Sequence, residues 1–551
     1  MKIFSSLLLT LILGAATLSA QPLHRQPLVG AVTDSKATIA AWGTIGGDLK
    51  LQYGTDETFN SNVQTMTQTA TQQNDLVAKF FLANLSPDTR YYYRVMSTTD
   101  QVLSKPASFK TFPAEGKDAP LTVFFGSCQQ GTTGDIGKTF KQAAQMGGDL
   151  FIQLGDWGYP DALIPGYPGT PGTIRQSYEL RLDTTYPFAR DILSQMPLAY
   201  VWDDHDFGGN NSSGALPETL RKELILNYDQ HIPHYDLPSS EGLWHSFTMG
   251  NVEFFMIDDR SQRNPVDSAF PGGKFKPPVG HSMLAGYPVS GVDQRTWLLN
   301  AIRTSTARWK VLVSQVFFNP ATSVGITLAL IGGRTDVAKE FADKWVGYPA
   351  DVDSMKALFQ SGYKKNFLII SGDAHTNLYD NGDHSIVPEF MAGALDKQNS
   401  NLNDVLKSYG LNIWTASQTG SSSAVGRIRV ETTPRHKMII ESFDTNGVKL
   451  LGYEMVDASS SAPATAEGAW RIVGTGSTER GLRLDMINAP EGEGTIAVFD
   501  ILGRKIIGAP ITLNRQSRMT VTLPPTLANG AYIAQITAAG TTATIRFDLA
   551  R

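Results

Sequence analysis

Nearly continuous apolar runs alternate with helix-like segments through the middle of the chain. The stretches 121–125, 150–154 and 367–370 are almost wholly apolar, which is typical of strands buried on both faces of a sheet. Segments expected to be helical, at 139–146 and 178–193, follow two of these runs. This alternation of strands and helices predicts an α/β core.

Both ends of the chain show a strand-rich pattern instead. Segments such as 37–42 and 49–53 have short alternating patterns and are separated by Gly, Asp and Asn turns, as in small β-sandwiches. The stretch 85–95, in which a turn precedes three consecutive tyrosines, is typical of a tyrosine corner. A Ser-, Ala- and Pro-rich stretch indicates a linker. These patterns predict a signal peptide at 1–20, an N-terminal β-sandwich at 21–116, an α/β core at 117–456, a linker at 457–468 and a C-terminal β unit at 469–551.

The N-terminus has the composition of a secretory signal. Lys2 supplies the positive charge, residues 4–18 are apolar and small, and Leu18-Ser19-Ala20 offers a cleavage site. The run is short for a membrane-spanning helix, and no later stretch is long and apolar enough to span. We therefore expect export through the periplasm, with the protein secreted or held at the cell surface.

Net charge and cysteine content bear on which ligands the protein can bind. The net charge of −5 and the pI near 6.0 give no support to nucleic-acid recognition, which favours a basic face. Cys128 is the single cysteine, so no internal disulfide can form. A lone cysteine after a buried strand is usually an inert core residue. Its position beside other ligand-bearing strand ends favours a metal-bound thiolate instead.

Side chains with metal-binding chemistry follow the apolar runs. Thiolate, phenolate, carboxylate and imidazole together suit iron, whereas an oxygen set with an asparagine amide suits calcium, magnesium or manganese; cysteine and tyrosine are also compatible with zinc. The mixture predicts two unlike sites, with Asp156 as the shared carboxylate. The candidate ligands are Cys128, Asp156, Tyr159, Asp203 or Asp204, Asn210 or Asn211, Asp373 and His375.

Structural alternatives exist for several of these residues. Asp156 can cap a helix N-terminus, His375 can be a hydrogen-bonded core histidine, and Tyr159 can be a packing residue. Arg260 can form a structural pair with Asp258 or Asp259. The Gly- and Pro-interrupted stretch 317–348 is a candidate lid over a site.

The ordered set of motifs resembles a known family. It is similar to alkaline phosphatase D, the cysteine-containing branch of the calcineurin-like metallophosphoesterases, over residues of about 26 to 456. The resemblance implies a two-sheet α/β core preceded by a fibronectin type III-like domain, Fe(III) held by Cys128, Asp156, Tyr159 and His375, and Ca(II) held by Asp156, Asp204, Asn210 and Asp373. The motifs that carry it are Ser127-Cys128-Gln129, Gly155-Asp156-Trp157-Gly158-Tyr159, Trp202-Asp203-Asp204-His205-Asp206 and Ser371-Gly372-Asp373-Ala374-His375.

The resemblance implies hydrolysis of phosphate monoesters by a metal-bound hydroxide. We expect His205 to protonate the leaving alkoxide or orient the phosphate, and Arg260 to offer a bidentate fork to the non-bridging oxygens. Phe207 stands where a subgroup with phosphodiesterase- and phospholipase-like members has Tyr, so diester hydrolysis of a phospholipase C or D type is the alternative. The remaining class is a non-catalytic, metal-stabilised surface binding protein.

The C-terminal unit resembles the type IX secretion sorting domain of Bacteroidota-like bacteria. The similarity implies export across the outer membrane by the type IX machinery, followed by cleavage or surface attachment. A plain accessory β-sandwich is the alternative. The residues that carry the similarity are 498–504, Leu523-Pro524, 529–532 and 544–547.

Overall fold

A computed structural model describes most of the chain. It covers residues 23–130, 136–397, 406–407, 410–418, 423–457 and, with short gaps, 471–549. The predicted signal peptide at 1–20 and nearly all of the predicted linker lie outside the described residues. The chain divides into two compact units, Met1–Asp457 and Ala458–Arg551.

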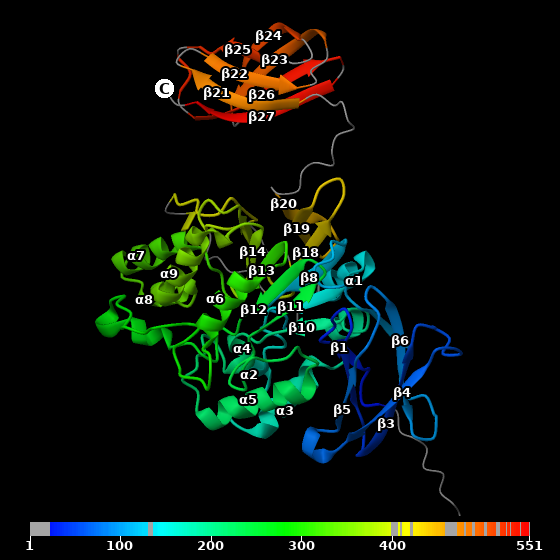
Figure 1. Ribbon diagram of the computed structural model, residues 1–551. Helices are drawn as coiled ribbons and strands as arrows, with labels where there is room; N and C mark the ends of the chain where they lie inside the picture. Colours follow the sequence, from blue (N-terminus) through cyan, green and yellow to red (C-terminus); the bar gives the residue numbers. More distant parts are fainter. Residues whose placement is uncertain are drawn as a thin grey trace, which may run out of the picture. The chain divides into compact units, whose positions relative to one another are not determined.

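Two large sheets form the centre of the first unit (Figure 1). Within the described residues the first sheet has the order β20 (Lys449–Val456), β19 (Lys437–Asp444), β18 (Ala424–Glu431), β8 (Leu121–Gly126), β9 (Leu150–Gln153), β10 (Leu198–Tyr200), β1 (Leu28–Gly30), β2 (Ala37–Trp42), β5 (Val77–Leu82). The second has the order β11 (His245–Met249), β12 (Val252–Met256), β13 (Trp309–Val313), β14 (Phe367–Ser371), β16 (Glu389–Met391), β15 (Asn377–Asp380), β17 (Ala416–Gln418). The expected two-sheet α/β core is confirmed.

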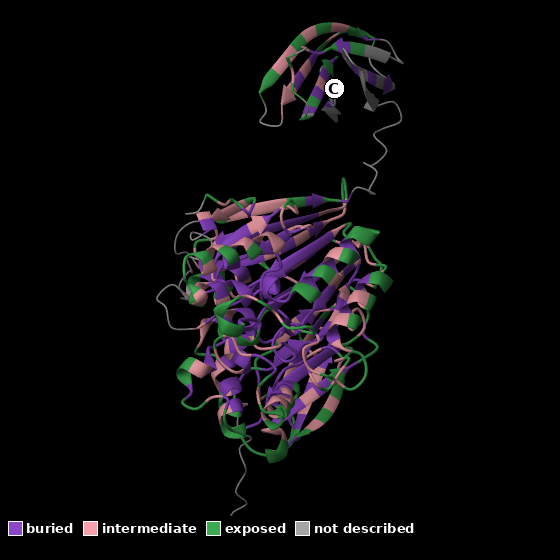
Figure 2. Ribbon diagram, turned by 90° about the vertical axis from the view of Figure 1, so that its left-hand side faces the viewer, coloured by how far each residue is buried: buried purple, intermediate pink, exposed green. Residues whose placement is uncertain are grey.

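The strands that carry the predicted ligands run in parallel. In the first sheet β9 pairs in parallel with β8 and β10, and in the second β13 pairs in parallel with β12 and β14. The apolar runs are buried at almost every position, because both faces of each sheet are covered (Figure 2). One hydrophobic cluster includes side chains of both sheets; Phe125 of β8 and Phe390 of β16 meet edge to face at 6.3 Å.

The N-terminal β region shares a sheet with the core. β1, β2 and β5 extend the first sheet beyond β10, with Gly30 aligned in parallel with Leu198. A separate four-stranded sheet, β4 (Gln64–Ala70), β3 (Gly47–Gly54), β6 (Arg90–Ser97) and β7 (Ala107–Lys110), completes this region. Tyr91 Oη accepts a hydrogen bond from the Ser86 N–H at 2.9 Å, the contact expected of a tyrosine corner.

Helices connect the strands. They are α1 (Ile136–Met146), α2 (Pro160–Leu163), α3 (Pro171–Arg181), α4 (Asp204–Phe207), α5 (Glu218–His231), α6 (Gln294–Thr304), α7 (Ser323–Ile331), α8 (Thr335–Ala342) and α9 (Pro349–Leu358). The helix expected at 139–146 is confirmed within α1, but a single helix over 178–193 is wrong. α3 ends at Arg181, and a π-helical turn spans Phe188–Ile192, because Pro187 cannot continue a helix from the preceding turn. No helix in the described part of the chain has the length and apolarity to cross a bilayer.

The second unit is a small β-sandwich. Its two sheets contain β21 (Arg471–Thr478), β22 (Gly481–Ile487) and β25 (Arg518–Thr522), and β24 (Lys505–Leu513), β23 (Gly492–Asp500), β26 (Gly530–Ala538) and β27 (Thr541–Leu549). Buried Leu484, Val498 and Ile536 belong to one core cluster between them. The sorting-domain motif at 498–504 lies at the β23–β24 connection, of which 501–503 are outside the described residues.

Candidate metal centre

The loops that follow β8, β9 and β14 bring four predicted ligands together. Cys128 Sγ lies 3.6 Å from Asp156 Oδ2, and Tyr159 Oη donates a hydrogen bond to the same oxygen at 2.9 Å. Tyr159 Oη also lies 3.0 Å from His375 Nε2. The thiol, carboxylate, phenol and imidazole that the sequence suggested as an iron site are therefore neighbours.

A second group lies on the other side of Asp156. The backbone N–H of His205 donates to Asp204 Oδ1 at 2.8 Å and contacts Asp156 Oδ1 at 3.4 Å. Asp203, Asp204 and Asp373 have ligand atoms within 4.8 Å of one another. Oδ2 of Asp156 thus faces the Cys128–Tyr159 side, while Oδ1 faces the Asp204 side. This is the arrangement of a carboxylate shared between two cations.

The backbone at these residues is unusual. Non-glycine residues in the left-handed region are uncommon, and each costs of order 1–3 kcal/mol unless the surrounding structure holds it. Such conformations cluster at functional sites. The residues concerned here are Cys128 (φ 60°), Asp156 (φ 56°), Tyr159 (φ 45°), Asp373 (φ 63°) and His375 (φ 46°).

Two features fix the loops in place. Gly155 has φ +92°, and a Cβ there would lie 2.4 Å from the backbone nitrogen of Asp203, so only glycine allows the β9 and β10 loops to meet. The loop after β8 is hydrogen-bonded to the loop after β9: Cys128 N–H donates to Gly155 O at 3.2 Å, and Gln129 N–H donates to Asp156 O at 2.8 Å. The ligand positions are therefore set by contacts between loops.

Asp206 holds the same loops from beneath. Its Oδ2 accepts from the N–H groups of Asp156 (2.6 Å) and Asp203 (3.0 Å), and its Oδ1 accepts from the Trp157 N–H (2.9 Å) and Arg181 Nη2 (3.0 Å). Asp206 is 2% exposed. Sequence reasoning assigned this residue no role, because its partners belong to other loops.

The clustered acidic groups favour a bound cation. Burial, followed by the charges of Asp204 and Asp203, raises the pKa of Asp156 well above its ordinary value. Burial, followed by Asp156, likewise raises the pKa of the Cys128 thiol. Burial alone would raise the pKa of Asp204, but Arg260 and His205 lower it below its ordinary value. Metal ions would relieve this repulsion, and the donor set fits them.

The sequence also allowed structural roles for Asp156, Tyr159 and His375, namely a helix cap, a packing residue and a core histidine. Asp156 does not cap α2, whose N-cap is Tyr159. Tyr159 is 1% exposed, so its ring is packed in the interior. Its hydroxyl nevertheless contacts both Asp156 and His375. The His375 ring contacts this phenol on the wall of a pocket.

A pocket of about 250 Å³ opens at the carboxyl ends of the strands. Asp204 faces it, whereas Asp203 is fully buried, does not line it, and accepts from Arg260 Nε. Asn210 and Asn211 both line the pocket, and the Asn211 N–H donates to Asp204 Oδ2 at 2.6 Å. The lining residues are Asp156, Asp204, His205, Asn210, Asn211, Glu340, Lys344, Asp373, Ala374 and His375.

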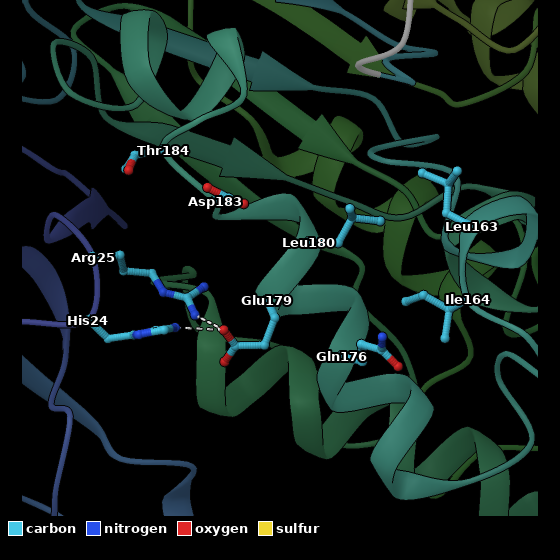
Figure 3. A pocket seen from close by; sticks show the side chains of 9 residues that line it. All are labelled: His24, Arg25, Leu163, Ile164, Gln176, Glu179, Leu180, Asp183 and Thr184. Carbon is cyan, nitrogen blue, oxygen red and sulfur yellow. Dashed lines mark hydrogen bonds and ion pairs between the residues drawn. The ribbon is translucent and has the colours of Figure 1, made fainter.

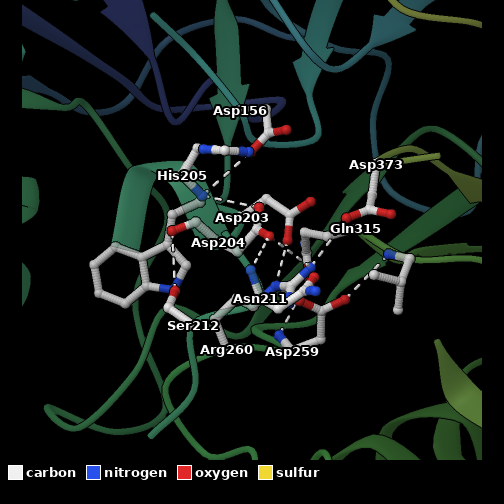
Figure 4. Close-up of polar contacts among 12 residues, drawn as sticks. Asp156, Asp203, Asp204, His205, Asn211, Ser212, Asp259, Arg260, Gln315 and Asp373 are labelled. Atoms are coloured by element: carbon white, nitrogen blue, oxygen red, sulfur yellow. Dashed lines mark hydrogen bonds and ion pairs between the residues drawn. The ribbon is translucent and has the colours of Figure 1, made fainter. Parts of the chain in front are cut away.

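Arg260 lies beneath the pocket and is fully buried. Asp203, Asp259 and Asp373 are drawn around it in Figure 4. Its guanidinium contacts Asp203 and lies 3.2 Å from Asp373 and 3.4 Å from Asp259. It also contacts Asp343 at 3.3 Å. The structure thus places Arg260 in a buried ion cluster rather than on the pocket wall where a phosphate contact was expected. The reason is that the end of β12 lies below the converging loops, so carboxylates from three other segments surround the arginine.

Lys344 is the lysine on the pocket wall. It is 4% exposed and pairs with Asp343 and Asp373. Although burial alone would lower its pKa, Asp373 and Asp343 raise the pKa above its ordinary value, so its ammonium stays charged. The stretch 317–348, considered a lid, forms the α7–α8 helical pair, and Lys344 anchors the segment after α8 in the core.

His205 is oriented by an acid that the sequence did not single out. Its Nδ1 lies 2.7 Å from Asp161 Oδ2, so the Nδ1–H donates to that carboxylate. Burial alone would lower the pKa of His205, but Asp161 and Asp204 raise it above the ordinary value. A protonated imidazole on the pocket wall suits a general acid.

A larger hollow of about 420 Å³ lies elsewhere, between His24 and Arg25 and the helix α3 (Figure 3). His24 Nε2 and Arg25 Nη2 both contact Glu179 of α3 there. None of the groups of potential metal ligands found among the described residues includes a residue of this hollow. Its contacts therefore join the N-terminal segment to the core.

Two known phosphatases are similar to this chain in sequence. The chain is 29% identical over 363 residues to alkaline phosphatase D of Bacillus subtilis (strain 168), covering 60% of this chain and 59% of that protein. It is 25% identical over 194 residues to purple acid phosphatase 23 of Arabidopsis thaliana, covering 33% of this chain and 40% of that protein. The chain thus spans less than two thirds of the length of these relatives.

Solved structures share the fold. A structure of PhoD has a TM-score of 0.61 at 22% identity, covering 80% of this chain and 92% of that one. Purple acid phosphatase PPD1 from yellow lupin (Lupinus luteus) seeds has a TM-score of 0.53 at 13% identity, covering 78% and 74%. The N-terminal domain of PhoD-like phosphatases matches residues 30–113, and the PhoD-like phosphatase family itself matches residues 123–438. The chain therefore belongs to the PhoD-like phosphatase family.

Proposed function

We propose that this protein hydrolyses phosphate esters at the Asp156 pocket, with monoesters as its main substrates. The observation that carries the proposal is the orientation of Asp156, whose two oxygens face two different ligand groups. Metal ions held there would lower the pKa of a bound water and neutralise phosphoryl oxygens. Family membership and the phosphatase names of the relatives support the same chemistry.

The donor sets support two unlike metals. Cys128, Asp156, Tyr159 and His375 offer sulfur, oxygen and nitrogen, a set that suits iron(III). Asp156, Asp204, Asp373 and one of Asn210 and Asn211 offer oxygen only, a set that suits calcium. Zinc, manganese and magnesium are the alternatives that metal analysis separates.

The residues on the pocket wall divide the remaining work. His205, held by Asp161, donates a proton to the leaving alkoxide. Lys344, on the same pocket wall, offers an ammonium to a phosphoryl oxygen. Lys344 replaces Arg260 in the role expected of a phosphate contact, because Arg260 does not reach the pocket.

Export is the second part of the proposal. The signal-like composition of residues 1–20 and the sorting-like motifs of the C-terminal sandwich support delivery to the cell surface or medium by the type IX machinery. Expression with and without residues 469–551 in a bacterium that has this machinery tests it. Retention of the shortened chain in the periplasm is expected, and equal export of both chains would contradict the proposal.

The activity is tested by metal analysis of the purified protein together with two substrates. Iron with calcium, and faster hydrolysis of p-nitrophenyl phosphate than of bis-p-nitrophenyl phosphate, are expected. Preference for the diester would move the assignment to a phosphodiesterase or phospholipase. Absence of both metal and hydrolysis would return the chain to the class of surface binding proteins.

A further inference from the structure

Glu340 of α8 is a pocket carboxylate outside the predicted ligand set. Its Oε1 accepts from Asn211 Nδ2 at 3.4 Å, so it lies against the loop that supplies Asp204's partner. The two lysines closest to it in sequence have other partners. Lys339 pairs with Asp267 at 2.6 Å, and Lys344 pairs with Asp343 and Asp373. The hydrogen bond that Glu340 makes on the pocket wall is thus with an amide, and Lys344 acts on its carboxylate only through its charge.

The other charged residues on the pocket wall already have roles in the proposed function. Asp156, Asp204 and Asp373 are committed to metal ions in the proposed function, and Lys344 and His205 to the phosphate and the leaving oxygen. Glu340 is the carboxylate left for the remainder of a substrate. The volume of about 250 Å³ corresponds to roughly eight water molecules at about 30 Å³ each, so the part of a substrate that the pocket holds is small.

The negative charge of Glu340 indicates which chemical group the rest of the substrate would carry. A negative group on the pocket wall disfavours a second phosphate or a carboxylate on the substrate. It favours an ammonium group, which gains a partner that water only partly screens. A neutral alcohol gains nothing from it.

We propose that Glu340 selects phosphate esters whose small leaving alcohol carries a positive charge, such as amino alcohols. This inference rests on the proposed phosphoesterase activity of the same pocket. Glu340 acts as a specificity residue, since it contacts the departing alcohol and takes no part in cleavage of the P–O bond.

The test compares two esters of the same shape. O-phosphoethanolamine and n-propyl phosphate differ by an ammonium in place of a methyl group. The metal-loaded, full-length protein is expected to have a kcat/KM about two- to fivefold higher for the charged ester, the range for a partly exposed ion pair. Glu340→Gln should bring the ratio to that of the neutral pair, and Glu340→Lys should invert it.

A matched control is available on the same helix. Asp336 of α8 pairs with Arg334 at 2.7 Å and does not line the pocket, so Asp336→Asn should leave the ratio unchanged. Equal kcat/KM for both esters in the wild-type protein, or an unchanged ratio in Glu340→Gln, would overturn the inference. So would loss of bound metal in Glu340→Gln, because Glu340 would then be a ligand. Failure of the wild-type protein to hydrolyse p-nitrophenyl phosphate would instead refute the underlying activity.

Discussion

The substitution Asp206→Asn tests how the metal centre is built without touching a ligand. The carboxylate accepts four hydrogen bonds, two on each oxygen, and one of the four donors is the Arg181 guanidinium. An asparagine has one acceptor oxygen, so either orientation of its amide leaves two donors facing an NH₂ group. Both side chains of the pair are only 1% exposed, so solvent cannot replace the lost contacts.

The magnitude follows from these contacts. Each unsatisfied buried group costs about 1–3 kcal/mol, and breaking a buried ion pair costs about 3–5 kcal/mol. These two estimates describe the same broken contacts and are not added. We therefore expect the free energy of unfolding to fall by about 4 kcal/mol. The first unit from residue 23 to residue 457 is a stretch of roughly 435 residues. With an unfolding entropy of about 2.1 cal/mol/K per residue, the melting temperature should fall by about 4 °C.

The assay is thermal unfolding of the full-length protein, with metal content measured on the same samples. Because Asp206 orients the backbone of Asp156, metal affinity should also fall by about 10- to 100-fold, as it does for residues that support ligands. Asp191→Asn is the matched control, since Asp191 pairs at 2.8 Å with Arg190, whose side chain is 52% exposed. That pair is worth about 1 kcal/mol at most. A melting temperature of Asp206→Asn within 1 °C of wild type, with unchanged metal content, would refute the reasoning.

Three further outcomes are expected. Asp156→Asn should remove bound metal and p-nitrophenyl phosphate hydrolysis together, because both ligand groups use this carboxylate; metal analysis and a rate assay check it, and retained activity would sink the shared-ligand assignment. His205→Ala should keep its metal but lower kcat by about 10²- to 10⁴-fold, the usual contribution of a general acid, whereas loss of metal in this variant would make His205 a ligand. Burial lowers the pKa of His245 from 6.5 to about 4, so the folded protein binds fewer protons than the unfolded chain between these values. Stability should therefore be lost as the pH falls through this window, by about 3 kcal/mol. His245→Gln should flatten the acid side of the melting-temperature profile of the chelated protein, and an unchanged profile would contradict the assignment.

Local sequence patterns were sufficient to find the ligand-bearing strand ends. A buried parallel strand is recognisable from its apolar run, and the residues just after it lie at the edge of the sheet where ligands gather. For this reason Cys128, Asp156, Tyr159 and His375 could be named together. The contact of Cys128 with Asp156 at 3.6 Å depends on the neighbouring strands β8 and β9, whereas the contact of Tyr159 with His375 at 3.0 Å joins the first sheet to the second, which the resemblance implied and the strand pattern alone did not.

Residues with distant partners could not be found in this way. Asp206 bonds to the backbone 50 residues away, and Asp161 to the ring of a histidine 44 residues away. Arg260 follows a strand end like the true pocket residues, but the second sheet places it under the loops. The pairing of Gly30 with Leu198 that joins the N-terminal strands to the core sheet is equally non-local, so sequence alone suggested an independent sandwich.

The construction of the pocket separates metal binding from substrate choice. The ligand loops are strained, with left-handed backbone at five ligands, and they are cross-linked by Gly155 and Asp206, so a change there alters several ligands at once. Glu340 comes instead from the α7–α8 pair, and its contact with the ligand loops is a single 3.4 Å hydrogen bond. Substitutions on α8 can therefore change which ester is preferred while leaving the metal centre intact. Variants at Glu340 should accordingly alter the kcat/KM ratio between esters without altering metal content, whereas variants at Asp206 should alter metal content without altering that ratio.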